Sequence, residues 1–129
     1  MKRTSLCFLF LTFYLSSCTY EKGEPANACG TPDTVSFSNN IIPLFNTYCN
    51  TGGCHSGGSP AGNLNLEPGA AYAQLMTPGS GYIDTLNPKF SLLYAQMNSG
   101  SSPMPPSGKL NSCKLELVLK WIQQKAKNN

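Results

Sequence analysis

Residues 49–56 read CNTGGCHS. Four residues separate Cys49 from Cys54, and the second cysteine is followed directly by His55, the only histidine in the chain. Two thiols and an imidazole at this spacing have three chemical uses: a small disulfide loop, a metal site, or covalent attachment of a haem. The interpretation of the rest of the chain depends on which of these uses applies.

Covalent haem attachment needs two thiols that add to the vinyl groups and an adjacent histidine that binds the iron. The common spacing is C-x-x-C-H, with two residues between the cysteines. Here the interval holds four residues, so two of them must bulge away from the porphyrin. Gly52 and Gly53 lie within that interval, and glycine accepts backbone angles that are closed to other residues. The longer spacing is therefore compatible with haem attachment.

The other two uses stay open at this point. A structural zinc site needs four nitrogen or sulfur ligands, and the motif supplies only three. Water, a carboxylate or one of the other cysteines would have to complete it. Copper held by Cys49, Cys54, His55 and Met104 would suit soft sulfur ligands. A disulfide between the two cysteines needs no special neighbours, but it does not explain why the sole histidine follows the second cysteine.

Met104 lies in residues 103–106 (PMPP), within a loop that proline stiffens and that offers little apolar company. A methionine in such a loop is poorly placed for a core but well placed to present its thioether to a metal. Met76 and Met97 fall on predicted helix faces, where packing is the usual role of methionine. Because the chain has no second histidine, two histidines of one chain cannot fill both axial positions of a haem iron. The sequence therefore favours haem held by His55 and Met104.

The first residues have the pattern of a secretory signal. Lys2 and Arg3 precede residues 6–15 (LCFLFLTFYL), an apolar run too short to span a bilayer. Residues 15–18 (LSSC) resemble the lipobox of bacterial lipoproteins, in which the cysteine is lipidated and becomes the mature N-terminus. We predict that residues 1–17 are a lipoprotein signal peptide and that Cys18 carries lipid.

The remaining chain divides into two parts. Residues 18–34 are polar, with glycine and proline, and are predicted to form the lipidated N-terminus and a tether. Residues 35–129 are predicted to form one small domain. Lysines nearly balance acids once the signal is removed, and no arginine is left, so a nucleic-acid partner is not expected.

Cys29 and Cys113 are the two cysteines without another role, because Cys7 leaves with the signal. In an oxidising compartment such a pair is predicted to form a disulfide. The bridge would close a loop of about 85 residues, which the chain-entropy relation values at roughly 4 kcal/mol. A covalent link of this kind suits a chain that has 12 glycines and 10 prolines in its 129 residues and that can form only a thin core.

Hydrophobic spacing predicts an all-α domain of about four short helices with long Gly/Pro-rich loops. The first is expected to begin near Asn39 or Asn40 and to end at the cysteine motif. The second is expected at about 68–76, and the third from an Asn87 cap to Met97. The last begins at a Ser112 cap and buries a stripe, with Trp121 off the stripe or at its edge. The stripe consists of Leu115, Val118, Leu119 and Ile122.

A family resemblance rests on these segments together. The segments are Phe37, residues 41–45 (IIPLF), the CNTGGCHS motif, residues 104–106 (MPP), Leu110 and residues 119–122 (LKWI). This pattern resembles the small cytochrome c domain lipoproteins of Gram-negative bacteria, in which C-x-x-x-x-C-H is a recurrent variant. The similarity covers about residues 35–126. It implies a class I cytochrome c fold whose first and last helices pack together beside a haem c, with His55 and Met104 as axial ligands.

An iron whose two axial positions are both filled by protein favours electron transfer over catalysis at the metal. We therefore expect a membrane-tethered c-type cytochrome that carries one electron between transient redox partner proteins. Its lipid anchor is expected in the cell envelope of a Gram-negative bacterium, at the outer membrane. The alternative is an accessory or binding lipoprotein without haem, in which Cys49 and Cys54 form a disulfide. A haem enzyme is a further possibility and would require Met104 to be displaceable.

Overall fold

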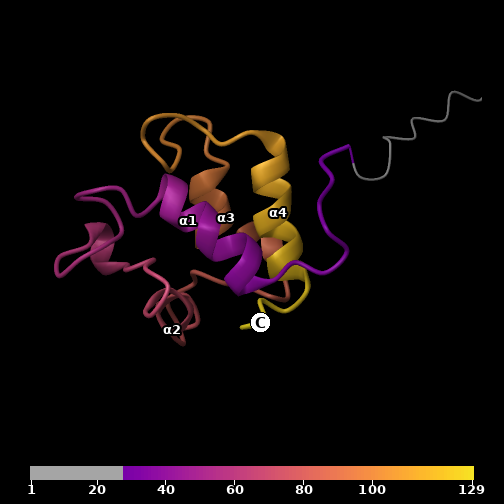
Figure 1. Ribbon diagram of the computed structural model, residues 1–129, viewed down its shortest axis with the longest axis horizontal. Helices are drawn as coiled ribbons and strands as arrows, with labels where there is room; N and C mark the ends of the chain where they lie inside the picture. Colours follow the sequence, from indigo (N-terminus) through magenta and orange to yellow (C-terminus); the bar gives the residue numbers. More distant parts are fainter. Residues whose placement is uncertain (1–27) are drawn as a thin grey trace, which may run out of the picture.

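A computed structural model describes residues 28–129, and this part of the chain is helical with no β-strand. It contains four α-helices: α1 (Ile42–Tyr48), α2 (Ala71–Leu75), α3 (Leu92–Met97) and α4 (Ser112–Gln123). Three short helical turns accompany them: η1 (Phe37–Ile41), η2 (Ala61–Asn63) and η3 (Pro88–Phe90) (Figure 1). The predicted all-α class is confirmed for these residues. The predicted signal peptide, Cys18 and most of the tether lie outside them.

The first helical segment starts earlier than predicted. The side chain of Ser36 accepts a hydrogen bond from the backbone N–H of Asn39 at 3.2 Å, so Ser36 caps η1, which runs directly into α1. Pro43 lies in the first turn of α1, the helical position in which proline is best tolerated. The apolar side chains of this segment face the core. They are Phe37, Ile41, Leu44 and Phe45.

The cap of α4 is Asn111 rather than the predicted Ser112. The Asn111 side-chain oxygen accepts from the backbone N–H of Lys114 at 3.0 Å, and Ser112 is the first helical residue. Three of the four predicted stripe residues are buried, while Leu119 is only half-buried. The helix itself and its apolar face are as predicted.

Trp121 is the main error in the prediction for α4, because it is fully buried rather than at the edge of the stripe. Its ring centroid lies 5.1 Å from that of Phe37. Its indole N–H donates to the carbonyl of Lys127 at 2.9 Å. Positive φ angles at Lys125 and Ala126 turn the chain back after α4 and bring that carbonyl to the indole. The buried face of α4 is therefore wider than its leucine stripe.

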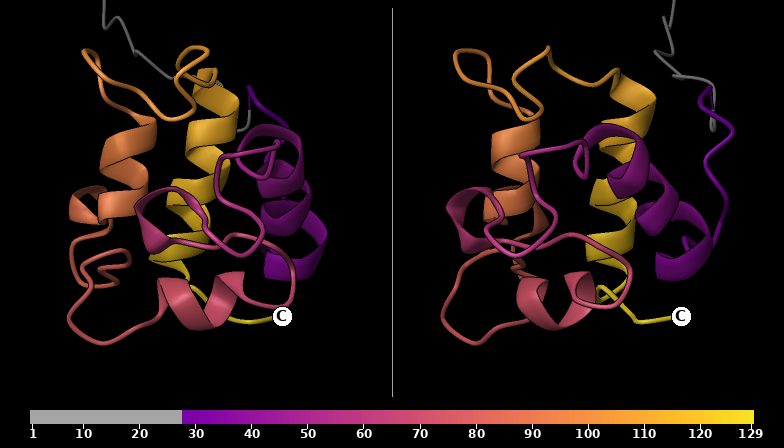
Figure 2. Two further views of the ribbon diagram at one scale, coloured as in Figure 1. Left: turned by 90° about the vertical axis from the view of Figure 1, so that its left-hand side faces the viewer. Right: turned by 60° about the vertical axis from the view of Figure 1, so that its left-hand side comes forward.

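The two ends of the domain are joined. α4 contacts both η1 and α3, and Figure 2 shows α3 and α4 side by side with α1 next to them. The carbonyl of Asn129 accepts from the backbone N–H of Ser38 at 2.9 Å, and its side-chain oxygen accepts from the N–H of Phe37 at 2.9 Å. The first and last helical segments therefore form one packed unit.

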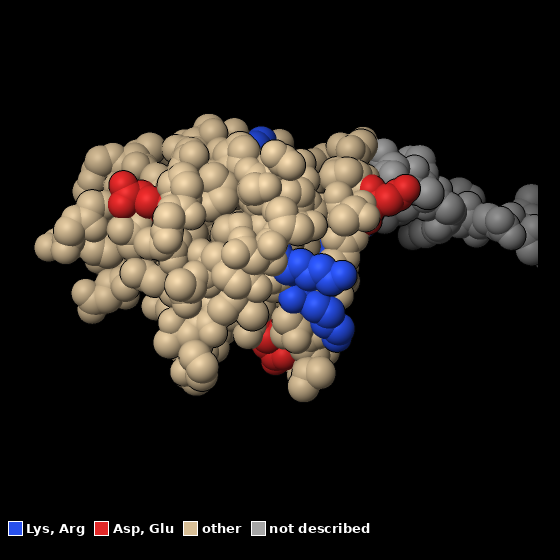
Figure 3. Space-filling view, turned by 60° about the horizontal axis from the view of Figure 1, so that its bottom comes forward, with Lys and Arg blue, Asp and Glu red and all other residues tan. Residues whose placement is uncertain are grey.

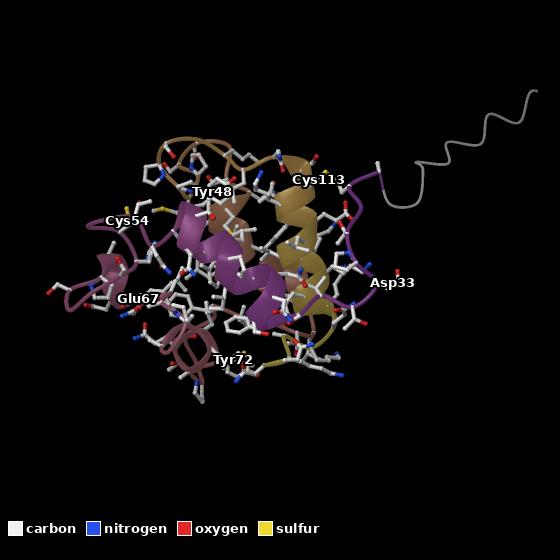
Figure 4. All side chains as sticks on the ribbon, viewed as in Figure 1. Asp33, Tyr48, Cys54, Glu67, Tyr72 and Cys113 are labelled. Carbon is white, nitrogen blue, oxygen red and sulfur yellow. A yellow bond between two sulfur atoms is a disulfide. The ribbon has the colours of Figure 1, made fainter. Side chains whose placement is uncertain are left out.

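The predicted disulfide between Cys29 and Cys113 is present, with Cα atoms 5.1 Å apart. It joins residues 84 positions apart in sequence and fixes the start of the described chain to the first turn of α4. Figure 4 shows Cys113 and Asp33 on one side of the molecule, opposite Cys54.

The middle of the chain differs from prediction in its boundaries. α2 is shorter than the predicted 68–76, and the predicted third helix is broken into η3 and α3 at Ser91. The Ser91 hydroxyl is buried and hydrogen-bonds both the N–H and the carbonyl of Asp84, at 2.9 and 3.3 Å. No helix in residues 28–129 has the length and apolar character that a membrane span requires.

Candidate functional site

A largely apolar cavity of about 450 Å³ lies between the cysteine motif, α3 and the proline-rich loop. The four residues predicted to hold a cofactor all line it: Cys49, Cys54, His55 and Met104. Met104 is far from the other three in sequence, so the fold brings them together. The apolar wall comes mainly from Met97 and four leucines, which are Leu64, Leu66, Leu92 and Leu93. In Figure 4 the labelled Tyr48 and Cys54 lie on this side of the molecule.

Backbone hydrogen bonds fold the extended motif into a closed loop. The His55 N–H donates to the Cys49 carbonyl at 3.0 Å, and the Cys54 N–H donates to the Thr51 carbonyl at 2.9 Å. Gly53 has a φ of 80°, a left-handed conformation that favours glycine. Residues 51–53 thus form an exposed turn, while Cys49, Cys54 and His55 remain on the cavity wall.

Asn50 holds this loop to the segment that follows it. Its Nδ2 group donates to the carbonyl of Leu66 at 2.8 Å and to Oδ1 of Asn46 at 2.9 Å. The N–H of Leu66 in turn donates to the carbonyl of His55 at 2.8 Å. The Oδ1 atom of Asn50 is buried and has no hydrogen-bond partner. The side chain therefore serves as a donor that ties residues 50 and 66 together.

The imidazole of His55 is oriented by a backbone carbonyl. Its Nδ1 atom lies 3.1 Å from the carbonyl oxygen of Leu64. A carbonyl can only accept, so Nδ1 carries the hydrogen in this bond, and in the neutral ring Nε2 keeps its lone pair. This is the arrangement that metal-ligating histidines use. The sequence did not predict this role of Leu64, because the contact is made by its backbone carbonyl and not by its side chain.

Both motif cysteines are free thiols. Cys49 is 8% exposed, and its burial, together with the nearby Cys54, raises the pKa of its thiol from 9.0 to about 11. Cys54 is half-buried, and the hydroxyl of Thr51 donates to its sulfur at 3.3 Å.

Residues 28–129 contain no group of three or more His, Cys, Asp or Glu side chains placed to hold a metal ion. Cys29 and Cys113 are joined to each other, so neither can complete a zinc site at the motif. The arrangement in this part of the chain therefore differs from that of a structural zinc centre.

Met104 lies in the proline-rich loop, which contributes Met104, Pro105 and Pro106 to the cavity wall. Its side chain is 38% exposed, and its backbone N–H donates to the carbonyl of Gln96 in α3 at 3.1 Å. Met97 is 2% exposed and packs in the core as predicted, although it also lines the cavity. Met76 was predicted to pack as well, but it is 37% exposed at the end of α2 and does not line the cavity.

Sequence reasoning missed the remaining polar groups of the cavity wall, which are Tyr48, Tyr82 and Gln96. The Nζ atom of Lys114 lies 5.2 Å from the centre of the Tyr48 ring, within the range of a cation–π contact. The position of Tyr48 directly before Cys49 was the one available sequence signal. Tyr82 and Gln96 reach the cavity only through the tertiary fold.

Comparison with protein-family models, curated proteins and solved structures finds no match.

Proposed function

We propose that this protein is a c-type cytochrome that carries one electron between redox partners. Cys49 and Cys54 would bind a haem through thioether bonds, and His55 and Met104 would be the axial ligands of its iron. The observation that carries the proposal is the meeting of these four residues on one apolar cavity. Three of them belong to a single loop, whereas Met104 comes from a separate loop anchored on α3.

The cavity is compatible in size and chemistry with a large apolar cofactor. A volume of about 450 Å³ lies in the usual range of small-molecule and cofactor sites, about 300 to 1,000 Å³. Its leucine-rich wall favours a large apolar ring, and His55 offers a free Nε2. A bound haem supplies a one-electron couple, and a methionine ligand raises its reduction potential. The chain's own residues would hold the ring, and the Leu64 carbonyl orients the imidazole.

We further propose that the helices follow the class I cytochrome c arrangement. The contact between η1 and α4 supports this, since in that fold the first and last helical segments pack together beside the haem. Phe37 and Trp121 form the centre of the contact, with ring centroids 5.1 Å apart.

The lipoprotein pattern of residues 1–18 supports a membrane-tethered carrier, and we propose the Gram-negative outer membrane as its location. Lipid on Cys18 would be followed by a short chain that becomes fixed to the domain at the Cys29–Cys113 disulfide. Fully extended, that chain reaches about 35 to 40 Å. The domain would therefore stay close to the membrane while it meets its partners, which is suited to transient redox encounters.

A visible spectrum tests the proposal. We expect purified protein from a bacterial host with a cytochrome c maturation system to show a Soret band and, after reduction, a sharp α-band. The colour should remain with the polypeptide after extraction with acidified acetone, because thioether bonds survive this treatment. Correctly exported protein that is colourless, or that contains a Cys49–Cys54 disulfide, would instead support the alternative of an accessory lipoprotein without haem.

A further inference from the structure

The cavity opens on a surface without charge. No aspartate, glutamate, lysine or arginine lines the cavity. The two chain segments that frame it, residues 49–66 and 90–108, contain none of these residues. We call the exposed part of the cavity lining the rim. Its one polar side chain is Gln96, and its other residues are Gly53, Ala61, Gly62, Leu92, Met104 and Pro106.

Charged residues next to these segments are few, and the side chains of two of them already interact with neighbouring groups. Lys114 lies over the ring of Tyr48, at 5.2 Å from its centre. Glu67 follows the first segment, and its carboxylate accepts from Nδ2 of Asn65 at 2.9 Å and from the N–H of Gly57 at 3.2 Å.

Three further charged residues flank the second segment. Lys89 and Lys109 lie at its ends. Asp84 contacts Ser91 through its backbone, and its carboxylate accepts from the N–H groups of Leu86 and Asn87. In Figure 3 lysines gather toward one side of the molecule, while the left-hand end, where the 50–66 loop projects, shows one acidic group.

We propose that this rim docks an uncharged, apolar surface that surrounds the cofactor of a redox partner protein. The inference rests on the proposed function, and it adds the chemistry of the partner. A charged partner patch would lose hydration at the rim and gain no opposite charge in return, whereas an apolar patch would gain from burial against Leu92, Met104 and Pro106. Association would therefore not depend on electrostatic steering.

Electron exchange between reduced and oxidised copies of the protein itself provides the probe, because each copy presents such a surface. One electron passes from a ferrous to a ferric copy, no bond or proton is transferred, and the driving force is zero in every variant. The exchange rate can be measured from haem resonances in mixtures of the two states. Raising the salt from about 0.01 M to about 1 M shortens the Debye length from roughly 30 Å to roughly 3 Å, and we expect the rate to change by less than about twofold.

Two matched variants place a positive charge either on the rim or away from it. Ala61 lines the cavity mouth in η2, whereas Ala73 is also exposed, on α2, and does not line the cavity. We expect Ala61→Lys to slow exchange by about threefold at low salt, because two like charges meet, and high salt should restore the rate. Ala73→Lys should behave like the unmodified protein. A rate that depends strongly on salt without substitution, or equal effects of the two variants, would overturn the inference.

A second readout does not involve electron transfer. In oxidised protein alone, amide resonances of residues 49–66 and 90–108 should shift as the concentration rises, and added salt should not reverse the shifts. Shifts that instead follow the lysines of α4 and disappear with salt would contradict an apolar docking face. Failure of the proposed function is distinguishable, because protein without covalent haem is colourless and overturns both proposals together.

Discussion

The Nδ1 atom of His55 lies 3.1 Å from the carbonyl oxygen of Leu64, and both residues line the same cavity. The bond fixes the tautomer and the ring orientation of the only imidazole in the chain. Leu64 can accept this bond only while the loop between residues 50 and 66 stays closed. The hydrogen bond from Asn50 to Leu66 is one of the contacts that close it.

Replacing Asn50 should therefore weaken the site-forming loop. Asn50→Ala removes hydrogen bonds to Leu66 and Asn46, and we expect the free energy of unfolding to fall by about 1 to 2 kcal/mol. Asn46→Ala is the matched control, because it removes only the exposed bond of the pair and should cost less than about 0.5 kcal/mol. Urea unfolding of both variants measures the difference. Equal losses would mean that the bond to Leu66 does not stabilise the loop.

If Met104 is the axial ligand that we propose, Met104→Ala should open one axial position of the haem iron. The reduction potential should fall and carbon monoxide should bind the reduced protein rapidly, because the thioether that raises the potential and closes the iron is lost. Met76→Ala is a closely matched control, since Met76 is 37% exposed and Met104 is 38% exposed, but only Met104 lines the cavity. Redox titration and carbon monoxide difference spectra measure these effects. Rapid carbon monoxide binding before any substitution would show that Met104 does not close the site.

The disulfide should contribute strongly to stability. Replacing both Cys29 and Cys113 by serine releases a bridge between residues 84 positions apart, and we expect a loss of about 2 to 4 kcal/mol in the free energy of unfolding. Chemical denaturation of the variant and of the parent, without reductant, measures the loss. A variant as stable as the disulfide-bonded parent would show that the bridge does not restrict the unfolded chain as the entropy relation requires.

Asp84 should give the fold a specific sensitivity to acid. The backbone N–H groups of Asn87 and Leu86 donate to its carboxylate and hold the pKa of that carboxyl below its usual value. A depressed pKa means that the ionised group stabilises the fold above the usual aspartate pKa of about 3.9, and that this contribution is lost as the pH falls through the lower folded value. The stability difference between the parent and Asp84→Asn should therefore be largest near neutral pH and shrink in acid.

Ser91→Ala provides the comparison for Asp84. It removes the neighbouring hydroxyl contacts to the Asp84 backbone, which do not titrate, so its effect on stability should not depend on pH. Urea unfolding at a series of pH values separates the two variants. Parallel pH profiles for Asp84→Asn and its parent would be inconsistent with a depressed Asp84 pKa in the fold.

Local patterns predicted the helices better than their ends. α4 follows its leucine spacing closely, yet its cap is Asn111 because that side chain, and not Ser112, reaches the N–H of Lys114. The third helix was expected to be continuous, but the buried contact between Ser91 and Asp84 interrupts it. Both differences arise from side-chain contacts that hydrophobic periodicity does not contain.

The candidate site was likewise predicted only in part. Its chemical groups were visible in sequence because Cys49, Cys54, His55 and Met104 are rare residue types in unusual settings. The Leu64 carbonyl that orients the histidine was not visible, since any residue could supply it. Similarly, the burial of Trp121 depends on a turn of the C-terminal chain, which brings the Lys127 carbonyl to the indole. Such contacts become predictable only when the tertiary fold is known.

The most direct test of covalent haem attachment is the mass of the peptide that contains residues 49–55, taken from denatured protein that a maturation-competent host has exported. We expect this peptide to contain one haem bound through Cys49 and Cys54, and the double variant with both cysteines replaced by serine to release all haem on denaturation. A peptide of unmodified mass, with two free thiols or a disulfide between them, would contradict the account.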